Sequence, residues 1–349
     1  MPSKRLRFIG LALFVIIGCA SAAQAKRTDD VVILKNGDRL TGEIKGLQRG
    51  ELKFKASYMA DAVRLDWSKV ARLESKDRYL IVLTNGRLYT DSLRLAQADA
   101  AADNFFIGDE QEAVSVRQLE VLRITPVEAG FFRQLVGTVD FGFSFTSGND
   151  QYQTEFSASA TYRKGSHALT ASVDSVFSGQ PKGTSNRRNQ FTFDYRKQLS
   201  PRWYTGGLFD LLRSDQQSLT LRTTVGGLIG RNLLQTERTS ISVFGGLAGT
   251  RENYSAQTGQ PQTTNADALA GLDFNTFRFK TTDISSRLSV YPSLTTPGRT
   301  RMQFKSDLRI QLYKDLYWGF HFYENFDSKP PVRADKNDLS VSTSLGWKF

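Results

Sequence analysis

The stretch 339–349 reads LSVSTSLGWKF. Its odd-numbered positions are mostly apolar, whereas its even-numbered positions are small or polar. Successive side chains of a β-strand point to opposite faces, so the alternation predicts a strand with one apolar face and one polar face. The stretch closes on two aromatic residues at apolar positions, Trp347 and Phe349.

Further stretches upstream repeat this pattern. In the first of them, Val139, Phe141 and Phe143 alternate with Asp140 and Gly142. The stretches hold about ten to thirteen residues each, and a tilted strand needs about nine to eleven to cross a membrane. Together they make twelve: two span 135–145 and 151–163, and the others centre near Val173, Phe193, Phe209, Thr223, Val243, Leu269, Leu288, Lys305, Phe320 and Leu345.

The connections between these stretches alternate in length. The longer ones are 178–189, 213–218, 251–264, 292–300 and 327–337, and the short ones include 164–166, 200–202 and 314–315. The short loop 147–150 and the turns near Gln235 and Phe277 are exceptions. Because bacterial membrane barrels combine short periplasmic turns with longer extracellular loops, the pattern predicts an all-β fold, a 12-stranded antiparallel transmembrane β-barrel. A large soluble barrel is the alternative.

An export signal is predicted at residues 1–25. Three basic residues precede the apolar run 8–18, which is too short to span a bilayer, and an A-x-A site ends at Ala25. A competing interpretation takes residues 16–19 as a lipobox with Cys19 as a lipidated N-terminus. Under the favoured interpretation the only cysteine leaves with the signal, so we expect neither a disulfide nor a thiolate metal site.

The composition fits an outer-membrane protein of a Gram-negative bacterium. The formal net charge is +11 and the mean hydropathy is −0.37, and no later run approaches 18 apolar residues. A barrel has such a hydropathy because every second residue faces water. Acidic residues are interspersed with the basic ones, so we expect a solvated surface of mixed charge and no nucleic-acid partner.

Residues 26–125 form a predicted periplasmic β-domain built from a tandem repeat. VVILKNG at 31–37 returns within 79–86, and LDWSKVARL at 65–73 returns as VSVRQLEVL at 114–122, both 49 residues later. A shared offset indicates duplication, with repeats at about 31–74 and 79–124. Each Asn-Gly predicts a hairpin turn, and each repeat resembles a small Sm-like or SH3-like module. The boundary with the barrel, residues 126–349, falls at Thr125-Pro126.

Sm-like modules often bind RNA, but this domain carries 17 basic and 16 acidic side chains, whereas phosphate binding needs a basic stripe. We therefore expect a structural or docking domain with a possible periplasmic protein partner. Phe54 and Trp67 are assigned to its core, and the Ala- and Asp-rich stretch 96–103 to a loop.

Charged residues alternate along the predicted inward face of the barrel. Because unpaired charges in a narrow lumen are costly, we expect them to pair and to brace or partly plug the lumen. Asp140, Glu155, Arg222, Arg287, Asp307, Arg309 and His321 are the candidate lumen network. The full predicted inward set also contains Asp174, Asp194, Asp210, Asp273, Asp283, Arg163, Arg196, Lys305 and Lys348.

Catalysis finds little support in the sequence. The chain has two histidines, His321 on the predicted inward face and His167 beside a predicted turn. Two isolated histidines make no triad or metal cluster, so we expect no catalytic residues, metal or cofactor.

Several motifs resemble the salt-induced outer-membrane protein family, which carries domain of unknown function 481. They are VILKNGDRLTG at 32–42, Asp66-Trp67, FTSGN at 145–149, LSPRWY at 199–204, LRTT at 221–224, YPSL at 291–294 and YENFDSKPP at 323–331. Asp150-Gln151 departs from the pattern, since many relatives carry Thr there. The resemblance implies no catalytic or binding residues.

The leading functional hypothesis is a non-enzymatic role in envelope structure or stress response. One alternative is a narrow solute-diffusion channel, and another is a lipid-active enzyme of the outer membrane. Expected partners are outer-membrane lipid and the barrel-assembly machinery, for which Trp347 and Phe349 are the predicted signal.

Overall fold

The computed structural model describes residues 30–84, 87–94, 104–108, 113–127, 135–146, 151–164, 166–180, 185–200, 202–236, 238–256, 262–279, 281–331 and 334–349. The predicted signal peptide, with its cleavage site at Ala25, lies outside these residues, as do the predicted loop 96–103, the second Asn-Gly turn at 85–86 and the connection 147–150.

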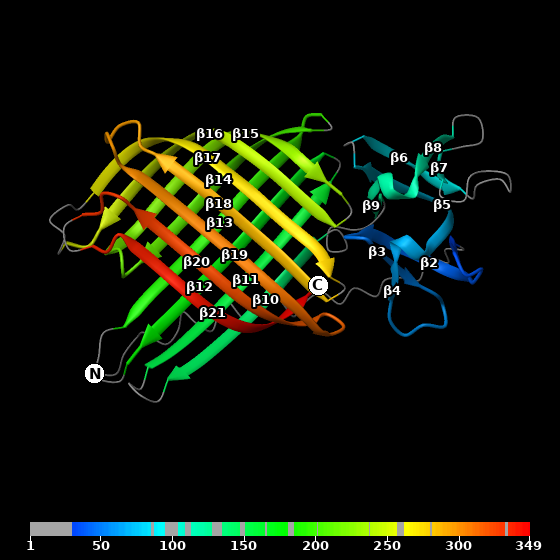
Figure 1. Ribbon diagram of the computed structural model, residues 1–349, viewed down its shortest axis with the longest axis horizontal. Coiled ribbons are helices and arrows are strands. Elements are labelled where there is room, and N and C mark those ends of the chain that lie inside the picture. Colours follow the sequence, from blue (N-terminus) through cyan, green and yellow to red (C-terminus); the bar gives the residue numbers. More distant parts are fainter. Residues whose placement is uncertain are drawn as a thin grey trace, which may run out of the picture.

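Twelve antiparallel strands of the described chain close into one barrel (Figure 1). Each strand pairs with the next along the chain, and the last pairs with the first. The predicted all-β fold and strand number are confirmed. The strands are β10 (Leu135–Thr146), β11 (Gln151–Lys164), β12 (His167–Gly179), β13 (Asn186–Gln198), β14 (Trp203–Ser214), β15 (Leu219–Gln235), β16 (Thr239–Tyr254), β17 (Gln262–Phe279), β18 (Thr282–Pro292), β19 (Thr300–Tyr313), β20 (Leu316–Asp327) and β21 (Asn337–Lys348).

The two ends of the barrel differ. Short connections such as Lys314-Asp315 gather at one end, which we call the proximal end, and longer ones such as 293–299 gather at the other, which we call the distal end. Trp203, Trp318 and Trp347 all lie near the proximal end with their side chains on the outer face, as expected for aromatic residues at a membrane interface.

Two tyrosines of the barrel strands lie inside the lumen and not at the membrane interface. Tyr204 and Tyr291 are buried inside the barrel, where they pack in one cluster with Phe244 and Leu269. Tyr204 also lies under the Arg196 guanidinium, 3.9 Å from the ring centre. These rings fill lumen space instead of contacting lipid.

A second, smaller domain precedes the barrel. Four of its strands, β1, β2, β9 and β5, pair in a closed circuit that makes a small barrel. β3 and β4 extend the sheet beyond β2, and β6, β7 and β8 extend it beyond β5. The elements are β1 (Asp30–Leu34), β2 (Arg39–Gln48), β3 (Glu51–Lys55), β4 (Val63–Asp66), β5 (Val70–Leu83), β6 (Leu88–Arg94), β7 (Asn104–Ile107), β8 (Val114–Arg117) and β9 (Val121–Pro126), with 3-10 turns η1 (Trp67–Lys69) and η2 (Gln118–Glu120).

One buried carboxylate ties this small barrel together. Asp30 on β1 accepts hydrogen bonds from the Ile44 backbone N–H on β2 (2.7 Å) and the Tyr79 hydroxyl on β5 (3.1 Å). The Ser75 hydroxyl on β5 donates to the same carboxylate. Burial raises the pKa of Asp30, although these three donors oppose the shift by stabilising the ionised form.

The two predicted repeats share one core instead of forming separate modules. β5 runs without a break across the predicted boundary between them, and a single apolar cluster contains residues from both halves, including Phe54 and Trp67. The expectation of two independent Sm-like or SH3-like units is therefore not confirmed. A continuous strand joins the halves too closely for each to have its own core.

The 3-10 turns show how the halves are related. η2 begins 51 residues after η1, whereas the sequence match of 65–73 with 114–122 predicts an offset of 49 residues. The structurally equivalent residues of the two halves therefore differ from the sequence match by two positions. The first residues of the two turns bond to each other: Trp67 Nε1 donates to the Gln118 carbonyl (3.0 Å), and Gln118 Nε2 donates to the Trp67 carbonyl. The equivalent turns thus meet at the centre of the domain.

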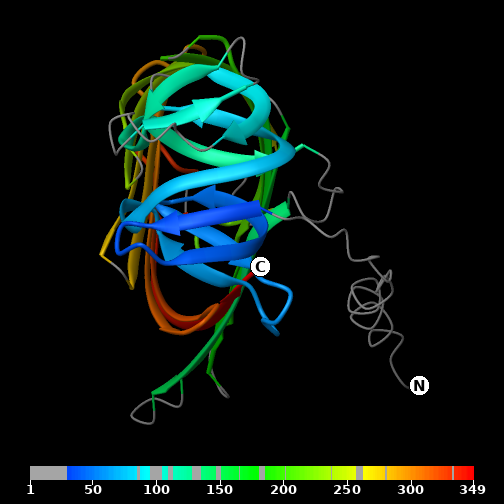
Figure 2. The same cartoon turned by 90° about the vertical axis from the view of Figure 1, so that its right-hand side faces the viewer.

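The domain lies against the proximal end of the barrel (Figures 1 and 2). Arg64 forms an ion pair with Asp315 and also donates to the Lys314 carbonyl (3.3 Å). Lys314 in turn pairs with Asp61 (3.2 Å), so contacts run in both directions across the junction. These partly exposed pairs fix the orientation of the domain more than they stabilise it.

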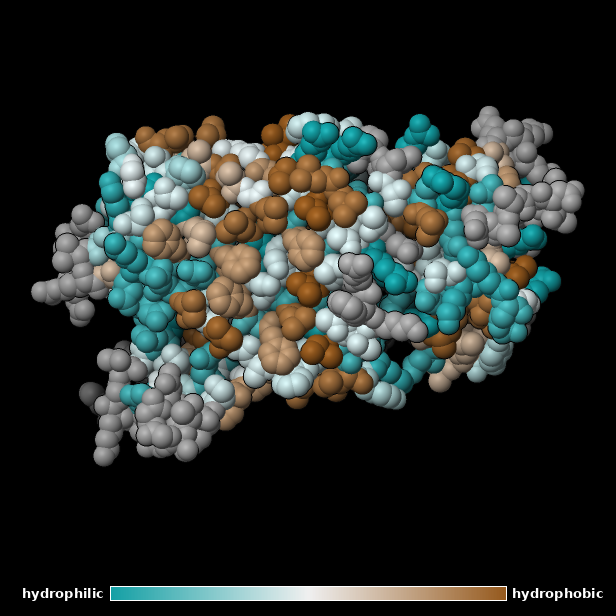
Figure 3. Space-filling view, in the orientation of Figure 1, coloured by the Kyte–Doolittle hydropathy of each residue, from teal (hydrophilic) through white to brown (hydrophobic). Residues whose placement is uncertain are grey.

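The outer face of the barrel is apolar. Figure 3 shows hydrophobic residues gathered over the visible side of the barrel. Val341, for example, leaves 65 % of its surface exposed, although a residue of this type is usually buried in a water-soluble protein. The exposed apolar residues on the strands include Val139, Phe141, Phe143, Phe156, Val173, Val225, Ile229, Leu247, Leu272, Leu339 and Leu345. An apolar band of this extent needs a lipid environment.

The terminal residue helps to close the barrel. Phe349 and Gly137 exchange two backbone hydrogen bonds of 3.1 Å, next to the pairing of Thr138 with Lys348. The Phe349 ring covers Gly137, and a Cβ at that position would clash with the ring and with the Ser159 carbonyl oxygen. A glycine is therefore required at this point of the seam between β10 and β21.

We predict that Gly137→Val weakens the closed barrel. The added side chain must displace the Phe349 ring or the strand, at an expected cost of about 1–3 kcal/mol. The measurement is the fraction of protein with heat-modifiable migration on SDS gels after refolding. Gly227→Val is the matched control, because a Cβ there meets no described atom within 4 Å. Equal folded fractions for both variants would contradict the assignment.

The charged lumen as candidate functional site

The lumen carries most of the polar chemistry of the barrel. Alternation along each strand turns charged side chains inward, and many of them are buried despite their charge. Buried charges need partners to offset their desolvation. The partners fall into three groups along the barrel axis: a distal cluster, a middle group around a cavity, and a proximal group around His321.

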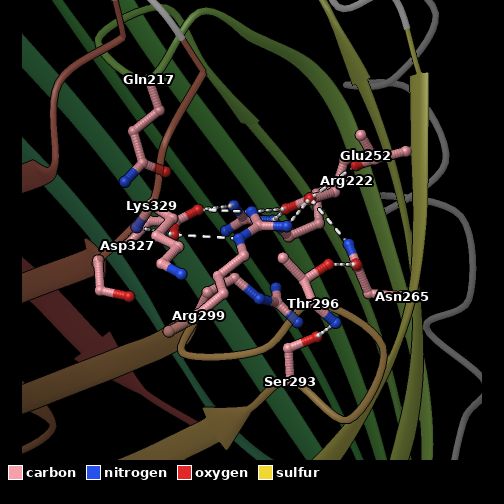
Figure 4. Close-up of polar contacts among 12 residues, drawn as sticks. Gln217, Arg222, Glu252, Asn265, Ser293, Thr296, Arg299, Asp327 and Lys329 are labelled. Carbon is pink, nitrogen blue, oxygen red and sulfur yellow. Dashed lines mark hydrogen bonds and ion pairs between the residues drawn. The ribbon is translucent and has the colours of Figure 1, made fainter.

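The distal cluster consists of Arg222, Glu252, Asp267, Arg299, Arg301 and Asp327. Glu252 lies at its centre and is 0 % exposed. Arg222 Nε donates to Glu252 Oε1 (2.7 Å), and Arg299 Nη1 donates to Glu252 Oε2 (2.7 Å). Arg299 also donates to Asp327 Oδ2 (2.5 Å). Figure 4 shows these side chains converging from opposite walls of the barrel.

A loop closes over this cluster. Residues 293–299 connect β18 to β19 and fold back on the barrel, where the Leu294 N–H donates to the Ala266 carbonyl (2.8 Å). Thr296 Oγ1 donates to Asn265 Oδ1 on β17 (2.8 Å). Because Arg299 ends this loop, the fold of the loop carries its guanidinium into the lumen, where it is buried.

The remaining pair of the cluster balances its charge. Arg301 donates to Asp267 Oδ2 (2.5 Å) and to Thr250 Oγ1 (2.8 Å). The cluster therefore holds three guanidinium groups and three carboxylates. Among the described residues, Arg222 Nη1 and Asp267 Oδ1 have no hydrogen-bond partner, so this packed cluster retains two unused polar atoms.

A cavity of about 150 Å³ lies in the middle of the lumen. Asp273 on its wall accepts from Arg287 Nε (2.6 Å) and Arg196 Nη2 (3.0 Å), and Arg287 also pairs with Asp194 (3.1 Å). Lys305, on the same cavity wall, pairs with Asp174 (2.7 Å) across the barrel. The cavity is thus lined by paired charges of both signs, without the surplus of one sign that selects ions.

The proximal group contains a serine–histidine–aspartate arrangement. His321 Nδ1 lies 2.7 Å from Asp307 Oδ1, and His321 Nε2 lies 2.8 Å from Ser344 Oγ. The expectation that His321 belongs to no triad is wrong in this respect, because pairing of β19, β20 and β21 brings the three residues side by side. Serines are too frequent in the strands for Ser344 to stand out in the sequence.

The hydroxyl of this arrangement has a competing acceptor. Ser344 Oγ donates to Asp140 Oδ1 (3.2 Å), and Ser344 is only 3 % exposed. A hydroxyl that donates its proton to Asp140 accepts from His321 Nε2, so the ring then carries protons on both nitrogens. The group can therefore act as a charged link between Asp307 and Asp140, and Ser344 has little room for an incoming substrate.

The predicted lumen residues do not form one network. Asp140, Asp307 and His321 meet in the proximal group, and Arg309 approaches Asp307 at 3.6 Å. Arg287 belongs to the middle group and Arg222 to the distal cluster. Glu155 is buried beside His321 in a small space of about 10 Å³, and its Oε2 has no partner among the described residues.

Sequence reasoning missed most of the distal cluster. Glu252, Arg299 and Asp327 fall in stretches that the sequence assigns to loops, because strands were expected to match the membrane thickness. The structure extends them: β15, β16 and β17 have 17, 16 and 18 residues. Continuing the alternation of β16 and β20 past the expected strand ends would have placed Glu252 and Asp327 on the inner face, whereas Arg299 lies on a loop, where no alternation applies.

Within the described residues, no group of three histidine, cysteine, aspartate or glutamate side chains is arranged to hold a metal ion. No helix in the same residues is long and apolar enough to cross a membrane.

The fold and its outer face define a membrane β-barrel protein. The family model described as "Protein of unknown function, DUF481" matches residues 139–349, which is most of the chain. The chain belongs to this family, as the motifs of its sequence predict. No curated protein matches it.

The chain is similar to several solved structures. The translocator domain of the autotransporter NalP from Neisseria meningitidis is 14% identical with a TM-score of 0.35, covering 62% of this chain and 88% of its own. The NanC porin is 12% identical with a TM-score of 0.40, covering 61% and 98%. The KdgM porin in complex with disordered oligogalacturonate is 8% identical with a TM-score of 0.34, covering 61% and 99%.

We predict that Glu252→Gln destabilises the barrel by about 3–5 kcal/mol, because it leaves two buried guanidiniums without their shared counter-charge. The measurement is the temperature at which heat-modifiable migration is lost in detergent micelles. Arg251→Gln is the matched control, because Arg251 is the exposed neighbour on the opposite face of the same strand. An equal melting temperature for Glu252→Gln and the wild type would show that the cluster is not structurally important.

Proposed function

We propose that this protein is a closed outer-membrane barrel with a structural or stress-response role in the envelope. The observation that carries the proposal is the distal cluster, in which Arg222, Glu252 and Arg299 bond across the lumen under the loop 293–299. In this proposal, ion pairs packed across the lumen block the path of a solute. The proposed role is non-enzymatic and needs no cofactor.

The apolar outer face and the tryptophans near the proximal end support a location in the outer membrane. In this proposal the proximal end and the N-terminal domain face the periplasm, because short turns occupy that side of bacterial barrels. Lipid is then the partner of the outer face. Trp347 and Phe349 act as the signal for the barrel-assembly machinery, and the N-terminal domain is free to dock a periplasmic protein.

A narrow diffusion channel is the second candidate. The cavity of about 150 Å³ favours it, since a space of this size in the middle of the lumen resembles a segment of an interrupted pore. A lipid-active enzyme has weaker support. Ser344, the hydroxyl that contacts His321 Nε2, is buried and donates to Asp140.

The experiment is single-channel recording of the purified protein in planar bilayers. We predict no conductance steps for the wild type. Glu252→Ala combined with Arg299→Ala removes the charges at the centre of the distal cluster and should produce steps, because the freed space admits water and ions.

Arg251→Ala is the control and should remain silent, since it lies on the outer face. Regular steps from the wild type would overturn the closed barrel and favour the channel. Steps that appear equally in the Arg251→Ala variant would show that the distal cluster does not set the barrier.

A further inference from the structure

Three basic side chains form one row on the outer face of the barrel at its proximal end. Lys164 of β11 pairs with His167 of β12, and His167 pairs with Lys197 of β13. All three side chains are exposed, and the alternation turns them away from the lumen, opposite to buried Asp174 on β12. Neighbouring strands lie about 4.8 Å apart, so the two lysine backbones are about 10 Å apart and their side chains can reach one group between them.

No acidic residue of these strands faces outward. The sequence has no aspartate or glutamate between Glu155 and Asp174, or between Asp194 and Asp210. These four acids lie on the inner face of β11–β14. Because like charges on neighbouring strands repel each other, an anion from outside the barrel would lower the cost of the row.

The row lies at the level of the membrane interface. Lys197 pairs with Thr205, which is two residues from Trp203 on the same face of β14. Trp203 is exposed on the outer face, and the guanidinium of Arg231 on β15 lies over its ring, 5.6 Å from the ring centre. Since tryptophans of a membrane barrel lie at the headgroup level, the lysine ammonium groups lie near the phosphates of the proximal leaflet.

The surroundings of His167 suit a headgroup with its chains. The Tyr195 hydroxyl lies 2.8 Å from His167 Nδ1, and the two rings stack with their centres 5.9 Å apart. This contact leaves Nε2 as the second hydrogen-bonding atom of the imidazole. Further along the outer face of the same strands, Val173 and Phe193 are apolar and exposed, so acyl chains can lie against them.

The row has no counterpart on the far side of the barrel. The outer face of the described strands β18–β21 carries no lysine or arginine. At the proximal end it presents Ile284, Ile310, Trp318 and Trp347 instead. A cationic row confined to neighbouring strands makes a local positive field that favours an anionic lipid over a zwitterionic one.

We propose that the outer wall of the hairpins β11–β12 and β13–β14 binds the headgroup of an anionic phospholipid, with its phosphodiester between Lys164 and Lys197. The ammonium groups contact the phosphate oxygens as point charges, and Arg231 borders the site. This inference rests on the proposed membrane location of the barrel but not on its closed lumen. Lipid preference and conductance can therefore fail separately.

The test titrates the full-length protein, refolded in detergent micelles, with phosphatidylglycerol or with phosphatidylcholine of the same acyl chains. Native mass spectrometry measures the affinity for the first bound lipid. We expect phosphatidylglycerol to bind at least about tenfold more tightly, because each lysine contributes about fivefold. Lys164→Gln and Lys197→Gln should each lower this preference about fivefold, and the double variant should lose it.

Lys197→Arg should keep the preference, because it keeps the charge. Arg251→Gln is the matched control, since Arg251 is an exposed, outward-facing cation at the distal end of β16. Heat-modifiable migration checks that each variant is folded. The proposal is overturned if the two lipids bind equally well or if the double glutamine variant keeps the preference. It also fails if Arg251→Gln lowers the preference as much as the lysine variants do, because net charge alone would then explain the effect.

Discussion

In a closed barrel, every second side chain of every strand must point into the lumen. The outer face of this barrel is apolar, so the polar half of each strand is confined to a narrow space away from lipid. Charged residues on that half persist only if they find partners there. The ion pairs of Glu252, Asp273 and Asp307 with arginine or histidine neighbours follow from this constraint.

Ion pairs form at both ends of the barrel, but with partners of different origin. At the distal end the partners come from the barrel itself, with Arg299 brought in by the loop between β18 and β19. At the proximal end the N-terminal domain supplies Arg49 to Asp283 and packs against the turn at Lys314. The domain thus adds a second partner to a barrel carboxylate that Lys348 also contacts. Its own fold depends on a shared core around Trp67, which holds the turn between β2 and β3, with Arg49, in a fixed position.

Much of the fold could be predicted from the sequence, because an alternation with a period of two is a strong signal over twelve strands. The same alternation correctly assigns Asp140 and His321 to the inner face. The distal cluster could not, because the membrane thickness limits the strand length one expects, whereas these strands continue beyond it. Arg299 lies on a loop, and no periodicity tells which way a loop folds. The predicted repeat offset of 49 residues is wrong by two residues at the 3-10 turns for a related reason. A match between strand patterns does not show which single residues of the two halves are equivalent, here Trp67 and Gln118.

The central claim is that paired charges shut the lumen, and the accessibility of one thiol tests it directly. Ser289→Cys places a thiol on the wall of the middle cavity, and the only natural cysteine of the chain is Cys19. In intact outer membranes, a charged, membrane-impermeant thiol reagent should leave this cysteine unmodified while it labels Lys336→Cys in the exposed distal loop. Adding Glu252→Ala and Arg299→Ala should make the lumen thiol reactive. Rapid labelling of Ser289→Cys without those changes would contradict the closed lumen.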